Sequence, residues 1–160
     1  MTIKVEIQTQ DFDISTEIKL FSQNRKDIGA VVSFIGLVRD INESNQVKTL
    51  ELEHYPGMTE KTIHAICKKA KDKWPIIQTT VIHRVGKLNP KDQIVLVLVS
   101  SKHRQSAFLA CEFIMDFLKT QAPFWKKEQT DQGLIWLDAK DSDTESLNKW
   151  QDNAAKNTKT

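Results

Sequence analysis

Residues 29–39 read GAVVSFIGLVR, a run dominated by β-branched and apolar side chains. Such a composition is typical of a buried β-strand. Other stretches have the alternating or β-branched pattern of further strands: Ile3 to Ile7, Leu50 to Glu53, Ile76 to Val85, Gln93 to Ser100, Phe124 to Gln129 and Leu134 to Ala139. The run at 29–39 is therefore predicted to belong to a sheet of several strands.

Helices are predicted between these strands. A short helix has Ser15 as its N-cap, and a second has Thr59 as its cap. The third, capped by Ser101, extends from Lys102 to about Lys119. Its apolar stripe is so wide that we expect burial on several sides, inside the domain or against a second subunit. The sum is an α+β domain in which helices pack on a mostly antiparallel sheet.

The length of 160 residues fits one domain, and the 39% hydrophobic content supports a core without disulfides or a structural metal. We assign residues 1–140 to this domain. Residues 141–160 form a polar tail in which Leu147 and Trp150 are the only large apolar residues. The tail is predicted to be mobile, or to order only on a partner.

The formal net charge of +2 argues against a nucleic-acid-binding protein, for which a strongly basic surface is expected. No stretch has the ~20 apolar residues of a membrane span, and no signal peptide is evident. We therefore expect a soluble, cytoplasmic protein with no membrane partner. The four histidines lack metal-binding spacing, so no metal site is predicted. Nucleotide-binding glycine loops and the serine-hydrolase motif are also missing from the sequence.

The two cysteines, Cys67 and Cys111, lie far apart in predicted helices and form no C-x-x-C pair. We interpret Cys111, which has apolar neighbours, as a small buried hydrophobic residue. If this protein moves sulfur, the sulfur is expected to arrive on another molecule.

A basic cluster, Lys102-His103-Arg104, follows Ser101 at the predicted start of the third helix. Cations are unfavourable there, because the N-terminal end of a helix dipole carries a partial positive charge. A bound phosphate would relieve this conflict through the free backbone N–H groups and the basic side chains. The alternative is that these long side chains bend away into solvent.

A second basic group consists of Lys119, Lys126 and Lys127, flanked by apolar rings around Pro123. A lysine desolvated beside other cations has a lowered pKa and can serve as a general base or nucleophile. The alternative for Lys119 is structural, because a lysine is favoured at a helix C-terminus. Arg39 closes the run at 29–39 and opens a loop, where it is either a ligand-binding fork or an ordinary surface arginine.

Five stretches, taken together and in order, resemble the large, catalytic subunit of molybdopterin synthase. They are residues 29–39, 52–58, 81–86, 101–108 and 119–127, and the similarity extends from about Gly29 to Asp143. The resemblance implies an α/β hammerhead-type domain that forms a homodimer. Two small ubiquitin-like sulfur-carrier subunits would bind at opposite ends of this dimer, giving a heterotetramer.

The activity that the resemblance implies is that of a sulfurtransferase in molybdenum cofactor biosynthesis. Each small subunit would insert a Gly-Gly tail that ends in a thiocarboxylate. Its sulfur would be transferred to cyclic pyranopterin monophosphate (precursor Z), and two such transfers would form the molybdopterin dithiolene. No resident cofactor is implied.

The resemblance also implies which residues act. Lys119 and Lys126 would be the catalytic pair, Lys119 in contact with the thiocarboxylate and in acid–base work, Lys126 in substrate orientation and charge stabilisation. Lys127 and Glu128 would line the same pocket. Lys140 stands where relatives often carry arginine; it keeps the charge without the bidentate fork, and its role stays open.

Substrate binding is implied for a further set of residues. Arg39, with the backbone of Leu37 and Val38, would hold the substrate, while His103 and Arg104 would bind its phosphate, from this chain or from its dimer mate. The alternative function is a non-catalytic module that binds a phosphorylated ligand or a ubiquitin-like tail.

Overall fold

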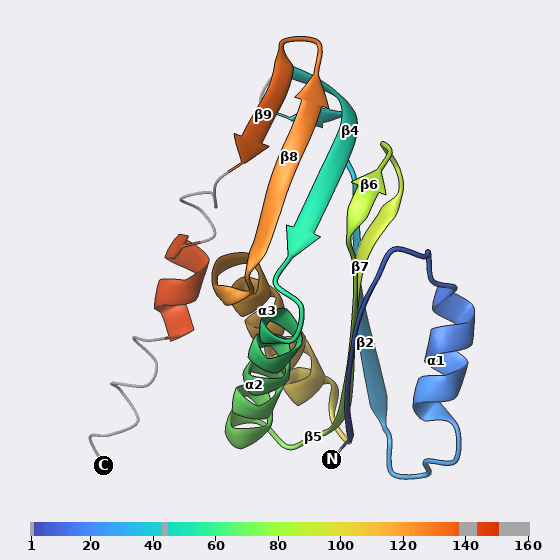
Figure 1. The fold of residues 1–160 in the computed structure, drawn as a ribbon. Coiled ribbons are helices and arrows are strands. Elements are labelled where there is room, and N and C mark those ends of the chain that lie inside the picture. Colours follow the sequence, from blue (N-terminus) through green and yellow to red (C-terminus); the bar gives the residue numbers. More distant parts are fainter. Residues whose placement is uncertain (1, 43–44, 138–143, 151–160) are drawn as a thin grey trace.

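The computed structural model describes residues 2–42, 45–137 and 144–150 (Figure 1). Four strands form the first sheet, in the order β1-β5-β7-β2. β1 pairs parallel with β5, and the other two pairs are antiparallel. The bounds of these strands are β1 Thr2–Gln8, β5 Ile76–Arg84, β7 Gln93–Ser101 and β2 Ala30–Leu37.

The second sheet is antiparallel and continues the molecule beyond the first (Figure 1). Its main order is β3-β4-β8-β9, and the short strand β6 also pairs with β4. The bounds are β3 Ile41–Asn42, β4 Asn45–His54, β6 Gly86–Leu88, β8 Phe124–Thr130 and β9 Gly133–Leu137. The predicted α+β class, with a mostly antiparallel sheet, is confirmed.

Helices cover both faces of the first sheet (Figure 1). The helices α2 (Met58–Lys73) and α3 (Arg104–Gln121) pack on one face, and α1 (Ile14–Ser22) packs on the other. The side chains of β7 alternate between these layers. Its valines at 95, 97 and 99 enter the core below α2 and α3, while Leu96 and Leu98 enter the core below α1. β7 is therefore the strand that both layers bury.

β2 differs from the buried strand that the sequence predicts. It lies at the edge of the first sheet, and Val31, Phe34 and Leu37 are exposed. A β-branched, apolar run indicates that its side chains favour burial, but it does not indicate whether residues of the same chain bury them. The prediction that this strand is buried is therefore wrong within a single chain.

All three predicted helix caps are wrong, although each helix is present. Asp13 caps α1 instead of Ser15, and its carboxylate accepts from the Thr16 N–H. Thr59 lies inside α2, where its hydroxyl accepts from the Tyr55 N–H at 3.0 Å and donates to the Pro123 carbonyl at 3.2 Å. Several polar residues near a helix start compete as caps, and tertiary contacts decide among them.

The third misassigned cap is at the start of α3. His103 occupies the N-cap position, so the helix begins at Arg104 and not at Lys102. The Ser101 hydroxyl instead donates to the Pro75 carbonyl at 3.0 Å and accepts weakly from the His103 N–H at 3.3 Å. Ser101 thus anchors the segment that leads into α3.

Part of the predicted tail is ordered against the domain. Residues 144–150 are helical, and Trp150 is only 8% exposed. Its indole N–H donates to the Asp116 carboxylate of α3 at 2.8 Å, and its ring meets Trp74 and Phe113 edge to face. Trp150 gives residues 144–150 apolar surface to bury, and the mobility expected of the tail stays a prediction.

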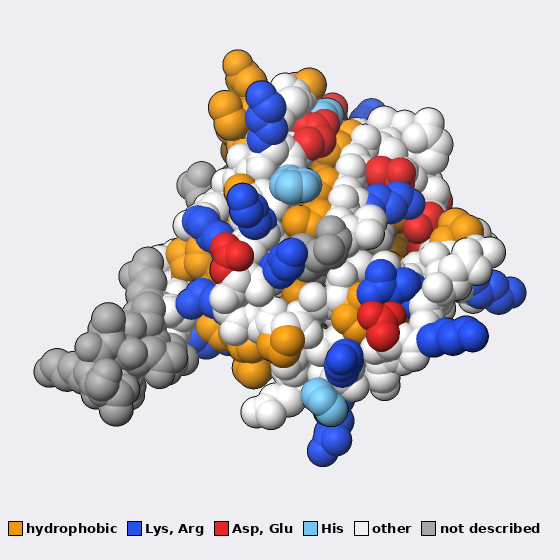
Figure 2. Space-filling model, turned by 90° about the horizontal axis from the view of Figure 1, so that it is seen from below, with side chains coloured by type: hydrophobic (Ala, Val, Ile, Leu, Met, Phe, Trp, Pro, Cys, Tyr) orange, Lys and Arg blue, Asp and Glu red, His pale blue; other side chains and the backbone are white. Residues whose placement is uncertain are grey.

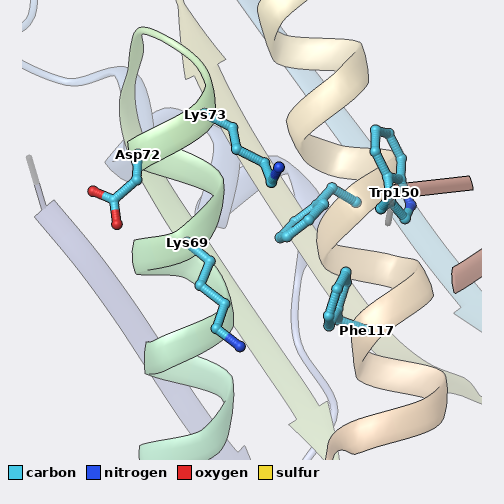
Figure 3. A pocket seen from close by; sticks show the side chains of 6 residues that line it. Lys69, Asp72, Lys73, Phe117 and Trp150 are labelled. Atoms are coloured by element: carbon cyan, nitrogen blue, oxygen red, sulfur yellow. The ribbon is translucent and has the colours of Figure 1, made fainter. Parts of the chain in front are cut away.

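Trp150 also lines a hollow of about 250 Å³ between α2 and α3 (Figure 3). The other lining residues are Lys69, Asp72, Lys73, Phe113 and Phe117. None of the sequence-predicted site residues lines this hollow. Among the described residues, no helix is long and apolar enough to cross a membrane.

The packing of Trp150 predicts a loss of stability on truncation. Trp150→Ala should lower the free energy of unfolding by about 3 kcal/mol, the lower end for a buried aromatic, because the ring borders a hollow. Trp136→Ala, at a tryptophan that is 56% exposed, is the matched control and should cost less than about 1 kcal/mol. Urea unfolding of both variants checks this. Equal, small losses would mean that the segment at 144–150 does not pack on α3.

Candidate functional site

The segment Leu37–Arg39 leaves the first sheet where β2 ends. The β2–β7 ladder changes register between Gly36 and Leu37. Val38 is buried, and its N–H donates to the Asp92 carbonyl at 2.9 Å while its carbonyl accepts from the Lys91 N–H at 2.8 Å. Leu37 and Arg39 on either side are exposed. The backbone of this segment is thus fixed, and the arginine side chain projects from a fixed point.

Lys119 lies in the last turn of α3, where the helix dipole favours a cation, and it is exposed. The chain then turns at Ala122 and Pro123 and enters β8 at Phe124. The contact of Thr59 with the Pro123 carbonyl holds this turn against α2. The end of α3 and the start of β8 are therefore joined by a short, anchored connection.

Alternation along β8 separates the two neighbouring lysines. Lys126 is opposite Leu52 of β4, on the same face as Phe124 and the buried Glu128. Lys127 is on the other face, where it pairs with Glu53 at 2.9 Å and lies 4.4 Å from the centroid of the Trp136 ring. The hydrogen bond that the Lys127 ammonium donates to the Glu53 carboxylate raises the pKa of Lys127. The structure thus brings Glu128, and not Lys127, to the face of Lys126.

His83, which the sequence leaves without a partner, supports the start of β8 from below. Its ring stacks on Phe124, with centroids 3.9 Å apart and planes at 19°. Its Nδ1 lies 2.8 Å from the Arg84 carbonyl, which can only accept, so Nδ1 carries the hydrogen. Burial, together with smaller effects of the nearby charges of Lys126 and His54, lowers the pKa of His83 to about 4. A neutral imidazole therefore lies beneath the strand that carries Lys126.

His103 and Arg104 lie at the opposite end of α3 and line a separate hollow of about 600 Å³ with Gln105, Phe108 and Leu109. Phe108 is 61% exposed. Figure 2 looks from below Figure 1 and shows more basic than acidic side chains on that face, beside apolar ones. The hollow combines the Arg104 guanidinium and the His103 ring with apolar walls, which suits an anion carried on a ring system.

Gly29 fixes the approach to this hollow. Its N–H donates to the Ser101 carbonyl at 3.1 Å, and a Cβ on Gly29 would lie 2.2 Å from the carbonyl oxygen of Lys102. Only glycine permits this approach of two backbones. The segment before His103 is therefore held directly against the start of β2.

The two ends of α3 are too far apart to share one small ligand. Lys119 comes fifteen positions after Arg104, which places the two residues about 22 Å apart along the axis at the rise of an α-helix. Arg39 follows the end of β2 that pairs with Gln93, while the segment before His103 lies at the other end of the sheet. Within one chain, the predicted site residues thus form two groups, one at each end of α3.

The described residues contain no cluster of three or more His, Cys, Asp or Glu side chains that could hold a metal ion. The chemistry available at the two ends of α3 is that of lysine, arginine and histidine. Such groups bind anions, stabilise developing negative charge and move protons.

Comparison with known proteins places this arrangement in a family. Residues 7–121 match the family described as MoaE protein. The chain belongs to the MoaE protein family. The resemblance predicted from five short stretches is thereby confirmed.

Relatives of this MoaE-family chain are similar over most of its length. A molybdopterin synthase catalytic subunit from Ralstonia nicotianae is 57% identical over 146 residues, which cover 91% of this chain and 83% of the relative. One from Vibrio cholerae is 50% identical over 151 residues, which cover 94% of this chain and 100% of the relative. The molybdopterin biosynthesis MoaE protein from Burkholderia ambifaria has a similar solved structure, with a TM-score of 0.81, 47% identity, and coverage of 94% of this chain and 99% of that one.

The burial of His83 predicts an acid-sensitive component of stability. Its folded-state pKa of about 4 lies below the ordinary 6.5, so only the unfolded chain binds this proton between those values. The contribution is fully present above pH 6.5, is lost as the pH falls to about 4, and amounts to about 3 kcal/mol. His83→Phe keeps an aromatic stack and should flatten the unfolding free energy over this range.

The matched control for this measurement is His64→Phe, at an exposed histidine of α2. Chemical denaturation at several pH values between 6.5 and 4 compares both variants with the wild type. A wild-type slope in His83→Phe would show that this histidine does not remain neutral in the fold.

Proposed function

We propose that this MoaE-family chain is the catalytic subunit of a molybdopterin synthase. It transfers sulfur from the C-terminal thiocarboxylate of a small ubiquitin-like subunit to cyclic pyranopterin monophosphate and forms the molybdopterin dithiolene. The observation that carries this proposal is the identity of 50% or more, over more than nine tenths of the chain, with proteins named molybdopterin synthase catalytic subunit.

The reaction requires one bond to sulfur to form and another to break. The thiocarboxylate sulfur bonds to a carbon of the pterin side chain, and its bond to the terminal glycine carbonyl carbon must then break. Water supplies the oxygen that leaves the small subunit with an ordinary carboxylate. Both described cysteines are buried and free, and burial raises the pKa of Cys67 to about 11, so neither is a suitable sulfur carrier.

We assign Lys119 to contact with the thiocarboxylate and to proton transfer, and Lys126 to substrate orientation and charge stabilisation. The anchored turn between α3 and β8 supports this pairing, because it fixes the elements that carry both lysines. Arg39 and the backbone of Leu37 and Val38 would hold the substrate.

Glu128 is assigned to the lining of this pocket, because it shares the face of Lys126. For Lys127 the support is weaker, since its partners Glu53 and Trp136 lie on the opposite face of β8. Lys140 lies outside the described residues, and its role stays open.

His103 and Arg104 would bind the substrate phosphate from a second copy of the chain. The separation of about 22 Å along α3 supports this assignment, because one chain cannot bring both groups to one substrate. The exposed apolar residues Val31 and Phe34 of β2 and Phe108 of α3 supply surface for a homodimer. With two small subunits, the assembly would be a heterotetramer.

The small subunit as a partner is supported by the structures of similar fold. One is a complex of subunits 1 and 2 of the molybdopterin-converting factor from Helicobacter pylori, at 21% identity and a TM-score of 0.66. Another is described as molybdopterin synthase from Staphylococcus aureus, at 35% identity and a TM-score of 0.76. We also propose a cytoplasmic location, because two free buried thiols suit a reducing compartment.

Turnover with defined components tests this function. The chain, a thiocarboxylated small subunit and cyclic pyranopterin monophosphate should yield dithiolene pterin, detected as its fluorescent oxidation product. Lys119→Ala should lower the rate at least about 100-fold, the usual loss for an acid–base group. Lys61→Ala, at an exposed lysine of α2, is the control and should leave the rate unchanged.

Two other outcomes would contradict parts of the proposal. Equal product from Lys119→Ala and wild type would remove Lys119 from the chemistry while keeping the function. No product from the wild type, despite measured binding of the small subunit, would favour a non-catalytic binding module.

A site shared between two copies predicts complementation. Lys119→Ala and Arg104→Ala homodimers should each be nearly inactive, since every site has one defect. When equal amounts of the two variants are mixed and their subunits exchange at random, about a quarter of wild-type activity should return. Half of the dimers are then mixed, and each mixed dimer has one intact site of two. Activity that stays at the level of the separate variants would place both residues in a site within one chain.

A further inference from the structure

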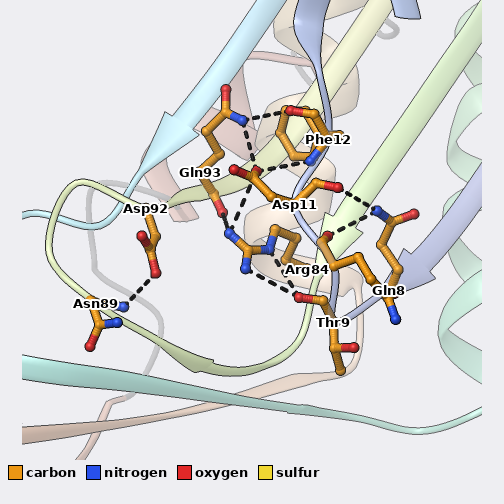
Figure 4. A network of polar contacts seen from close by, with 9 residues as sticks. Gln8, Thr9, Asp11, Phe12, Arg84, Asn89, Asp92 and Gln93 are labelled. Carbon is orange, nitrogen blue, oxygen red and sulfur yellow. Dashed lines mark hydrogen bonds and ion pairs between the residues drawn. The ribbon is translucent and has the colours of Figure 1, made fainter.

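Arg84, the last residue of β5, holds together chain segments that are far apart in the sequence (Figure 4). Its Nε and Nη2 both donate to the Thr9 carbonyl at 3.2 Å, and its Nη1 donates to the Gln93 carbonyl at 3.0 Å. The Asp11 carboxylate lies 3.6 Å from Nη1. The side chain is only 12% exposed. Three N–H groups of the guanidinium therefore donate to backbone carbonyls, and the side chain is mostly buried.

Gln93, the first residue of β7, is fixed from its side chain as well as from its carbonyl. Its amide donates to the Asp11 carboxylate and to the Phe12 carbonyl, both at 2.8 Å. These bonds tie the start of β7 to the segment that follows β1 (Figure 4). The residue before it, Asp92, is therefore attached to an anchored point.

Asp92 belongs to the turn 89–92, which closes on itself. The Asn89 N–H donates to the Asp92 carboxylate at 2.8 Å, and the Asp92 N–H donates to the Asn89 carbonyl at 3.0 Å. Lys91 has a positive φ of 75°, a conformation that such a closed turn must enforce. The turn thus presents the Asp92 carbonyl and the Lys91 N–H in a fixed orientation.

Both of these groups bind Val38. The turn accepts from the Val38 N–H and donates to the Val38 carbonyl, just where the regular β2–β7 ladder ends. A continuous path of hydrogen bonds and adjacent residues therefore leads from Arg84 through Gln93 and Asp92 to Val38 and Arg39. Beyond the Arg84 guanidinium each link is a backbone group, so a change at Arg84 is transmitted along the main chain from Gln93 to Val38.

We propose that Arg84 is a positioning residue for the substrate-binding segment Leu37–Arg39, acting through the turn 89–92. This inference rests on the proposed function, in which Arg39 binds the pterin substrate. Arginine is required because its planar fork reaches two carbonyls on different segments at once, which a lysine cannot do. Arg84 contributes to the affinity for substrate without touching it.

Kinetics in two backgrounds test the proposed path. Arg84→Gln should lower kcat/KM for cyclic pyranopterin monophosphate about 10-fold, mainly through KM, at saturating small subunit. In an Arg39→Ala background the same change should lower it less than about 2-fold, because residues on one path are not additive. Arg84→Lys, a milder change for folding, should show the same pattern. Equal losses in both backgrounds would overturn the proposal.

Amide hydrogen exchange tests the positioning without any turnover. In Arg84→Gln the Val38 and Lys91 amides should exchange at least about 10-fold faster, whereas the Val81 amide in the middle of β5 should not change. Arg25→Gln is the matched control, because Arg25 forms an exposed ion pair with Asp27 at 2.6 Å before the start of β2, whereas the path reaches β2 at its other end. An unchanged Val38 amide would overturn the positioning role.

Kinetics and amide exchange together distinguish a failure of the positioning role from a failure of the proposed function. Faster exchange at Val38 with additive kinetics would overturn the link to substrate, while the proposed function stands. Faster exchange with a wild type that shows no turnover would reject the proposed function and, with it, the catalytic purpose of Arg84, but not the structural path.

Discussion

The burial of β7 on both faces is the constraint on which the rest of the structure depends. Alternate residues of this one strand enter two cores, so α2 and α3 must cover one face of the sheet and α1 the other. The two ends of β7 then lie where the functional groups are. Its first residue, Gln93, follows the turn that fixes Val38, and its last residue, Ser101, anchors the segment before His103.

The sequence predicts much of this fold because the periodicity of strands and helices is a local property. The strand at 93–100 and the helix that follows are evident from their side chains alone. The caps are not, because Ser15, Thr59 and Ser101 are all chemically suited to the N-cap positions that Asp13, Gly57 and His103 occupy instead. For the same reason Trp150 does not reveal itself as a core residue: its partners lie on helices more than thirty residues earlier.

The arrangement of the candidate site also follows only in part from the sequence. The resemblance names Arg39, His103, Lys119 and Lys126, and the structure confirms none of their roles; it shows where they lie. It adds that His83 supports β8 as a neutral ring, and that Lys127 is on the other face from Lys126. Neither follows from spacing, because each depends on pairing between strands that are distant in sequence.

The length of α3 has a consequence for how such a protein behaves when it is dilute. If the groups at its two ends bind one substrate, the smallest active species is a dimer, and a folded monomer is inactive. Output per chain would then depend on how often chains meet, falling on dilution even though every molecule keeps its native structure. A cell could silence the reaction by lowering abundance, without inhibitor, modification or unfolding.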